Sequence, residues 1–273
     1  MTTMPKTDAG EENIAVVDWL GQPIDCSRCS HADLLAAGKC RPGHACVQDR
    51  YAKRIDRFFH WNRDLANTYL SHPYFEVRAV GAKYASIFHL GKLVKDPDET
   101  VRMSVAMRLP EKYLLGMRND PHREVRIRVA SRLTGGELAP MRHDEDYYVR
   151  MLVARRLPPD MLILMLDDPE PLVRVEVARR IPVQRLPSLA ADPDGAVRLA
   201  VAERLEPEQL VPLLQDEDWR IRYQAVERVS VAHLWPLQAD SDPEVRRLVQ
   251  ERLGLIDEQK ERQAGNGKDF ARQ

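Results

Sequence analysis

The sequence predicts an all-α fold, a solenoid of eight helical repeats that follows a small four-cysteine cap. A branched residue followed by arginine recurs eight times, at every twenty-fourth position from Val77 to Val245. All four cysteines of the 273-residue chain fall between Cys26 and Cys46. Apolar residues make up 44% of the chain but aromatic residues only 6%, which favours cores of Val, Leu, Ala and Met between packed helices.

The bulk properties exclude several classes of partner. The formal net charge of -1 gives no global attraction to nucleic acid or to an anionic membrane. No stretch approaches the roughly 18 to 20 apolar residues that span a bilayer, and the start, MTTMPKTDAGEEN, lacks an export signal. We therefore expect a cytoplasmic protein that needs neither a membrane nor nucleic acid.

Four segments follow one another along the chain. We expect an N-terminal tail over residues 1–20, the cap and its junction helices over 21–70, the repeats over 71–254 and a polar tail over 255–273. Aromatic residues gather in the junction, where we expect them to form core rather than a ligand platform.

The cap contains the pattern C-x2-C-x10-C-x5-C, formed by Cys26, Cys29, Cys40 and Cys46. Four thiolates so close in sequence can converge on one metal centre, and both zinc and a [4Fe–4S] cluster accept four thiolates. Zinc modules usually show two close pairs, whereas the second pair here is separated by five residues. The absence of cysteine elsewhere suits a reducing compartment and a metal site better than a disulfide framework.

Basic residues dominate the segment after the last cysteine. Such cations would stabilise an anionic cluster, although a solvated helix face explains them almost equally well. The histidines nearby, His31, His44, His60 and His72, are not expected to be ligands because four thiols are present. The basic residues are Arg50, Lys53, Arg54, Arg57 and Arg63, with Arg41 just before, against Asp49 and Asp56.

The repeats carry an apolar stripe with the spacing of an α-helix. The stripe starts at the recurring branched residue, continues four residues on and ends eight residues on, and a small residue after the middle position allows close helix packing. The first positions are Val77, Val101, Val125, Val149, Val173, Val197, Ile221 and Val245. The last positions are Ala85, Leu109, Leu133, Leu157, Ile181, Leu205, Val229 and Leu253.

Prolines set the expected element boundaries. Asp96, Asp120, Asp168 and Asp192 each precede a proline, which predicts a helix N-cap and first turn at these positions. Prolines after the stripe limit the α-helix to about three turns. The leucine pairs that follow, three residues apart, predict a short 3₁₀ or single-turn helix in each repeat.

The pattern D-P-x-x-x-V-R-x-x-V-A-x-R-L-P-x-x-x-L-x-x-L resembles the leucine-rich repeat variant family, most specifically between Asp96 and Leu214. The resemblance covers about residues 72 to 254 and implies alternating α- and 3₁₀-helices stacked into a right-handed superhelix. It also implies that the N-terminal cysteines bind a [4Fe–4S] cluster, with zinc as the remaining alternative, and that the protein is associated with nitrogen fixation.

Two rows of arginine recur with the repeat. One row follows the first stripe position, from Arg78 to Arg246, and the other precedes the last stripe position, from Arg108 to Arg252. A groove for an acidic partner is one interpretation, but we favour a structural role in which the guanidinium groups pair with aspartates or carbonyls of adjacent repeats. Partner recognition would then fall to variable positions such as Tyr147, Tyr148 and Trp219.

These features predict a non-enzymatic iron–sulfur protein whose solenoid binds an unidentified, acidic protein partner. The cluster could transfer electrons, sense redox state or oxygen, or stabilise the cap, and the sequence leaves these three roles open. Four cysteine ligands leave no iron open for a substrate. The alternatives are a zinc-capped scaffold and a nucleic-acid-binding base glycosylase, for which Trp219 beside Asp216 and Asp218 is the one hint.

Overall fold

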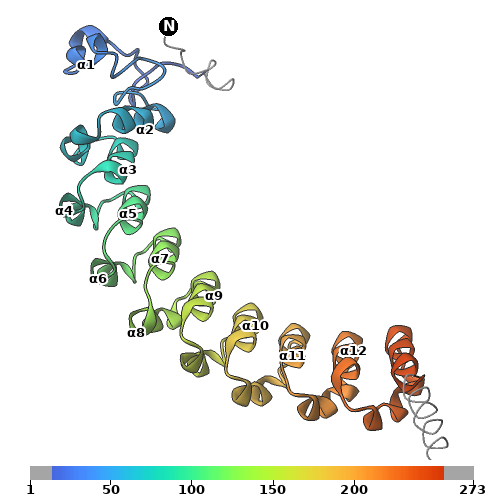
Figure 1. Cartoon of the computed structure of the whole chain (residues 1–273). Coiled ribbons are helices and arrows are strands. Elements are labelled where there is room, and N and C mark those ends of the chain that lie inside the picture. The colour runs from blue at the N-terminus through green and yellow to red at the C-terminus, as the bar shows by residue number, and fades with distance from the viewer. Residues whose placement is uncertain (1–13, 255–273) are drawn as a thin grey trace, which may run out of the picture. The chain divides into compact units, whose positions relative to one another are not determined.

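A computed structural model describes residues 14–254, which group into two compact units divided between Leu133 and Thr134 (Figure 1). Each unit is described by itself. The predicted C-terminal tail and residues 1–13 of the predicted N-terminal tail lie outside the described residues. The predicted boundary between cap and repeats near residue 70 stays a prediction.

The first unit contains the cap and the first repeats. Isolated β-bridges join Val17 to Pro23, Asp18 to Asp49 and Arg41 to Ala45. The helices of the cap and junction are η1 (Cys26–Arg28), α1 (Ala32–Ala36), α2 (Ala52–Trp61) and η2 (Arg63–Tyr69). The helices of the repeats are α3 (Phe75–Tyr84), α4 (Ile87–Leu90), η3 (Gly91–Leu93), α5 (Glu99–Ala106), α6 (Glu111–Leu114), η4 (Leu115–Met117) and α7 (Arg123–Ala130).

The second unit repeats the same alternation of one α-helix with a shorter element. The first helices of this unit are α8 (Gly135–Leu138), η5 (Ala139–His143), α9 (Tyr147–Arg156), η6 (Pro159–Met165), α10 (Pro171–Arg180) and η7 (Val183–Leu189). It continues with α11 (Gly195–Ala202), η8 (Pro207–Gln215), α12 (Trp219–Arg228), η9 (Val231–His233) and η10 (Trp235–Ala239), and residues 243–254 are helical.

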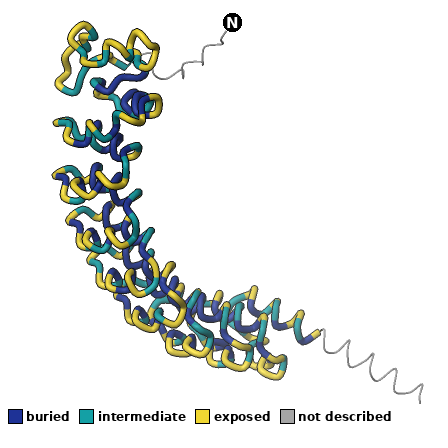
Figure 2. Tube along the Cα trace, turned by 60° about the vertical axis from the view of Figure 1, so that its left-hand side comes forward, coloured by how far each residue is buried: buried dark blue, intermediate teal, exposed yellow. Residues whose placement is uncertain are grey.

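The predicted all-α fold of alternating α- and 3₁₀-helices is confirmed. All eight branched residues that begin the stripe are fully buried, and the residues that end it are at most 8% exposed. In Figure 2 the buried positions run through the middle of each unit, and the exposed positions mark the outer turns and short helices. Among residues 14–254 no helix combines the length and apolar character needed to cross a membrane.

The predicted helix starts at the Asp-Pro pairs are wrong by two residues. The N-cap of α5 is Asp98, whose side chain accepts a hydrogen bond from the backbone N–H of Thr100 at 2.9 Å. Asp96 instead accepts the backbone N–H of Asp98 at 3.0 Å, so it closes a turn that leads into the helix. Asp120, Asp168 and Asp192 accept the N–H two residues on in the same way.

These aspartates have a second partner, an arginine that precedes them in the chain and lies in the previous repeat. The guanidinium Nε donates to one carboxylate oxygen at 2.7 to 2.8 Å, and a terminal nitrogen donates to the other, so each pair is bidentate. We call these pairs the arginine–aspartate ladder: Arg78–Asp96, Arg102–Asp120, Arg150–Asp168, Arg174–Asp192, Arg198–Asp216 and Arg222–Asp240.

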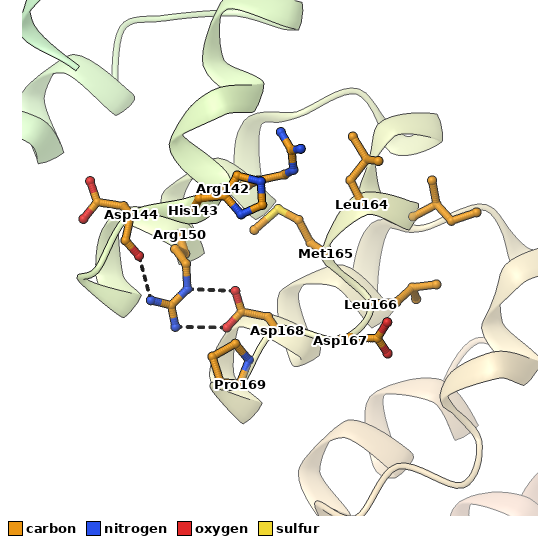
Figure 3. A pocket seen from close by; sticks show the side chains of 11 residues that line it. Arg142, His143, Asp144, Arg150, Leu164, Met165, Leu166, Asp167, Asp168 and Pro169 are labelled. Carbon is orange, nitrogen blue, oxygen red and sulfur yellow. Dashed lines mark hydrogen bonds and ion pairs between the residues drawn. The ribbon is translucent and has the colours of Figure 1, made fainter. Parts of the chain in front are cut away.

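Each ladder arginine also supports the turn before its own helix. The remaining nitrogen of Arg150 donates to the carbonyl of Asp144 at 2.9 Å, as the dashed lines of Figure 3 show beside the Arg150–Asp168 pair. These residues form part of the wall of a cavity of about 340 Å³ that includes Leu164 and Pro169. The guanidinium therefore ties two repeats together.

The second arginine row serves the preceding repeat. Arg108, Arg132, Arg180, Arg204, Arg228 and Arg252 donate at 2.5 to 2.9 Å to carbonyls in the last turn of the helix one repeat earlier. The last carbonyls of an α-helix have no partner within the helix and carry partial negative charge, so an arginine there satisfies both needs. The structural interpretation of both rows is thus confirmed.

Candidate metal centre

The first two cysteines lie at the two ends of η1. Cys26 begins this short helix and Cys29 is its C-cap, with its N–H donating to the carbonyl of Cys26 at 3.4 Å. Asp25 caps the start through its side chain, which accepts the N–H of Ser27 at 2.9 Å. One helical turn therefore holds both ends of the C-x2-C pair, and both thiols are partly exposed.

The last two cysteines flank a tight turn. Arg41 and Ala45 exchange two backbone hydrogen bonds, both of 2.8 Å, and Gly43 at the turn has a φ of 71°. Cys40 and Cys46 stand directly outside this bridge, so the five residues between them fold back instead of separating the thiols. The Pro42-Gly43 dipeptide is a turn signal that would have explained the longer spacing from the sequence.

Burial is the main influence on the pKa values of the last two thiols. Burial raises the pKa of Cys46 to about 11, with smaller contributions from Asp49 and then Cys29. Burial also raises the pKa of Cys40, and Cys29 and Cys26 raise it further. All four sequence-predicted cysteines are free thiols: Cys46 is buried, and the other three are partly exposed.

The donor set fits an iron–sulfur cluster chemically, because four thiols are its usual protein ligands. Within the described residues, no three His, Cys, Asp or Glu side chains converge closely enough to hold a single metal ion. Beside Cys29 a cavity of about 370 Å³ opens, and Asp25, Arg28 and Ser30 contribute to its wall.

A buried ion pair fixes the chain directly after Cys46. Arg54 donates from a terminal nitrogen to Asp49 at 3.0 Å, and the two side chains are 2% and 0% exposed. Arg54 also donates to the carbonyls of Ile14 and Ala15, and Asp49 accepts the N–H of Tyr51 at the start of α2. This pair joins the cysteine loop, the N-terminal segment and α2.

Arg54 lies one full repeat before Arg78 in the sequence and so occupies the register of the ladder. The residue at the corresponding aspartate position is His72, whose Nδ1 accepts the N–H of Tyr74 at 3.1 Å, as the ladder aspartates do two residues on. Arg54 pairs instead with Asp49 of the cap. Continuing the 24-residue pattern one repeat toward the N-terminus would have identified Arg54 from the sequence.

The predicted role of the basic segment as a counter-charge for the cluster is only weakly supported. Arg54 is engaged with Asp49, and Arg57 donates to the carbonyl of His44 at 3.3 Å. Arg63 lies over the ring of Tyr84 at 5.8 Å. Burial is the leading influence on the pKa values of Cys40 and Cys46 and raises both, and no arginine or lysine of the described residues is among the influences on either thiol.

An aromatic cluster joins the cap to the first repeat. The hydroxyl of Tyr69 in η2 and Nε2 of His31 share a hydrogen bond, and the Tyr69 ring packs against Phe58 and Phe59 of α2. Burial and the thiols of Cys29 and Cys46 raise the pKa of Tyr69 to about 12, which keeps its hydroxyl protonated. Phe58 and Phe59 are buried, as predicted for the junction core, and Tyr69, Tyr74 and Phe75 are partly buried. The prediction is wrong for Trp61, whose side chain is 41% exposed.

The other histidines of the region also have non-metal contacts. The ring of His44 packs against Trp61 with 5.5 Å between centroids, and the ring of His60 lies 6.5 Å from that of Tyr84. Burial lowers the pKa of His72.

Asp216 and Asp218, the carboxylates considered for a base glycosylase, both form hydrogen bonds within the repeats. Asp216 pairs with Arg198 in the ladder, and Asp218 caps α12 through the N–H of Arg220. The ring of Trp219 is 42% exposed and meets only the edge of Tyr223 among aromatic groups of the described residues. These contacts give Asp216 and Asp218 structural roles.

Comparison with known proteins yields two family matches. A profile described as "LRV protein FeS4 cluster" matches residues 16–68, which contain all four cysteines. A profile described as "Leucine rich repeat variant" matches residues 195–218.

One solved structure and one sequence relative are similar over longer stretches. The solved structure, titled "A leucine-rich repeat variant with a novel repetitive protein structural motif", is 42% identical with a TM-score of 0.79, and the match covers 84% of this chain and 98% of that one. The relative is an "Uncharacterized 27.7 kDa protein in nifB 3'region" of Rhodobacter capsulatus, 49% identical over 94 residues. That match spans 34% of this chain and 38% of the relative.

Proposed function

Because this chain belongs to the leucine-rich repeat variant family and carries its N-terminal iron–sulfur cluster domain, we propose that it is a non-enzymatic cluster-binding scaffold that docks a protein partner. The observation that carries the proposal is the folding of the cap. One helical turn holds Cys26 and Cys29 at its two ends, and one tight turn lies between Cys40 and Cys46. We further propose that the protein acts in the cytoplasm.

We assign Cys26, Cys29, Cys40 and Cys46 as the ligands of a [4Fe–4S] cluster. When bound, such a cluster supplies a one-electron redox couple. With a cysteine for each iron, no coordination position remains for a substrate, which supports a role without catalysis. The Arg54–Asp49 pair holds the loop after Cys46 against α2, and Tyr69 holds the segment after Cys29.

The proposed biological setting is nitrogen fixation. The support is the relative whose name places it in a nifB 3' region, together with the resemblance of the repeats. A partner in electron supply or cluster assembly would suit a protein that presents a cluster beside a surface for docking. Stacked repeats are commonly used as extended binding surfaces.

The test is anaerobic purification of the full chain, followed by analysis of iron, acid-labile sulfide and zinc. We expect about four irons and four sulfides per chain, and none of either in a Cys40→Ser variant that keeps its far-ultraviolet helical signal. Ser27→Ala, in the same cap but without a thiol, is the matched control and should retain the cluster. Colourless protein with one zinc per chain would refute the iron–sulfur assignment.

A further inference from the structure

An apolar patch stands on the short-helix side of the first repeats. Phe88 of α4 is 90% exposed, and Ile87 and Tyr113 beside it are 40% and 54% exposed. With Leu109 and Pro110 they surround a cavity of about 290 Å³. In Figure 1, α4 and α6 follow one another on the same side of this unit, opposite α3 and α5.

Stacking of the repeats does not require this patch. Phe88 lies in the short connecting helix of its repeat, and an aromatic side chain appears at this position in no other repeat of the sequence. The equivalent residues are Lys112, Gly136, Asp160, Gln184, Glu208 and Ala232. A large apolar side chain held almost wholly in water is a feature of binding surfaces more than of scaffolds.

The charges around the patch are mostly positive. The two connecting segments that carry it, residues 86–95 and 110–119, contain four cations and one anion. The five equivalent segments at 134–143, 158–167, 182–191, 206–215 and 230–239 together contain two cations and five anions. The basic character is therefore specific to the first repeats and is not a property of the repeat.

Three of these cations are available to a partner. Lys92, Lys95 and Lys112 are exposed and form no ion pair within the part of the chain that the structure describes. The ammonium group of Lys112 lies 4.9 Å from the centroid of the Tyr113 ring, at the rim of the cavity. The arginine rows differ, because their guanidinium groups are already engaged with aspartates and carbonyls of neighbouring repeats.

We infer that Ile87, Phe88, Leu109, Pro110 and Tyr113, with Lys92, Lys95 and Lys112 at the rim, dock an acidic protein segment that carries an apolar side chain. This set, the Phe88 surface, deepens the docking role and rests on the proposed function. The cavity accepts the apolar anchor, and the lysines meet the carboxylates around it. Apolar anchors dominate the affinity of such contacts, while rim charges contribute association rate and selectivity.

The experiment measures binding of a fluorescein-labelled, Asp- and Glu-rich peptide with a central Leu-Leu-Trp to the full chain, by fluorescence anisotropy. Phe88→Ala should weaken binding about 10-fold or more, and Lys112→Glu about fivefold at low salt. Trp235→Ala, at an aromatic residue that is 62% exposed, and Arg185→Glu are matched controls and should bind like the natural sequence. Because Phe88 is exposed, its replacement leaves the core intact.

Three results would overturn the inference: no binding of the acidic peptide, equal binding by the Phe88→Ala variant, or equal binding of a peptide with Lys in place of its acidic residues. Sedimentation at several concentrations tests a second copy of this chain as the occupant. Self-association that Phe88→Ala abolishes, without peptide binding, would assign the surface to that copy and also overturn the inference.

Iron and sulfide content of the same samples separates this inference from the proposed function. A full cluster without peptide binding would refute the Phe88 surface alone. Peptide binding that responds to the variants in a chain without iron would refute the iron–sulfur scaffold and leave the surface standing.

Discussion

Arg174 of one repeat holds Asp192 of the next through two hydrogen bonds, from Nε to Oδ2 at 2.7 Å and from a terminal nitrogen to Oδ1 at 2.8 Å. The arginine side chain is 11% exposed and the aspartate side chain 4%. The same guanidinium reaches the carbonyl of Asp168 at 2.8 Å. One side chain therefore joins three segments of backbone.

Removing one partner of a ladder pair should destabilise the fold strongly. Arg174→Ala leaves the carboxylate of Asp192 buried without its cation, and we expect a loss of about 3 kcal/mol in the free energy of unfolding in urea. Arg179→Ala is the control, because its bond to Glu176 is 3.5 Å long and its side chain is 56% exposed, so it should cost less than about 1 kcal/mol. Equal losses in both variants would contradict this role of the ladder.

The arginine–aspartate ladder should also make the stability of the fold fall at acid pH. Burial, the largest single influence, would raise the pKa of Asp192, Asp216 and Asp240. The hydrogen bond and charge of the paired arginine and a backbone N–H hydrogen bond together outweigh burial and hold each pKa below the ordinary 3.8. Because the folded-state pKa lies below the unfolded one, the stabilisation is complete above about pH 5 and is lost as the pH falls through the folded-state values.

Urea unfolding at several pH values between about 7 and 3 tests this expectation. The free energy of unfolding should stay level at the upper end and fall steeply below about pH 4. An Asp192→Asn variant, already weaker at neutral pH, should show a smaller fall. An identical fall in the variant would mean that other carboxylates set the acid limit.

The small residue after the middle stripe position should resist enlargement. Ala178 of α10 is fully buried, and α10 packs against both α9 and α11. We expect Ala178→Val to cost about 1 to 3 kcal/mol through overpacking. The exposed Ala191 provides the control, where the same change should stay within about 0.5 kcal/mol. Thermal unfolding monitored by circular dichroism would reveal a similar cost at both sites if close helix packing were unimportant.

The Arg54–Asp49 pair should control the retention of the cluster. Arg54→Met leaves a buried carboxylate next to the loop of Cys46, so we expect loss of most iron and sulfide while the helical signal of the repeats persists. Arg63→Met changes an exposed arginine of the same region that lies over Tyr84, and it should retain the iron. Unchanged iron in the Arg54 variant would show that the cysteine loop holds its shape without this pair.

The sequence predicted those features that are periodic. The burial of Val77 and its equivalents follows from the spacing of apolar residues. This spacing is visible within a single repeat and recurs in all eight. The helix starts were misplaced because an aspartate before proline has the same signature whether it caps a helix or closes the turn before it. Asp96 closes a turn because Arg78, distant in sequence, also needs its carboxylate.

The sequence singles out the four candidate ligands of the metal centre, but it does not reveal the side chains that support the cysteine loops. Four cysteines in a chain without others are conspicuous, and the Pro42-Gly43 turn was readable in principle. The contacts of Arg54 with Asp49 and of Tyr69 with His31 depend on how the cap folds back on α2 and η2. No local pattern encodes such long-range pairings, and the basic segment therefore suggested a counter-charge where the structure has ion pairs and carbonyl contacts.

The ladder gives the repeat array a direction and a fixed unit of length. Each arginine pairs with an aspartate of the next repeat toward the C-terminus. A cut between two repeats therefore leaves an unpaired arginine on one fragment and an unpaired aspartate on the other. Removing residues 173–196 takes out Arg174 together with Asp192 and leaves Arg150 with Asp168 and Arg198 with Asp216. The array can consequently be lengthened or shortened only by whole repeats without leaving an unpaired charge inside it.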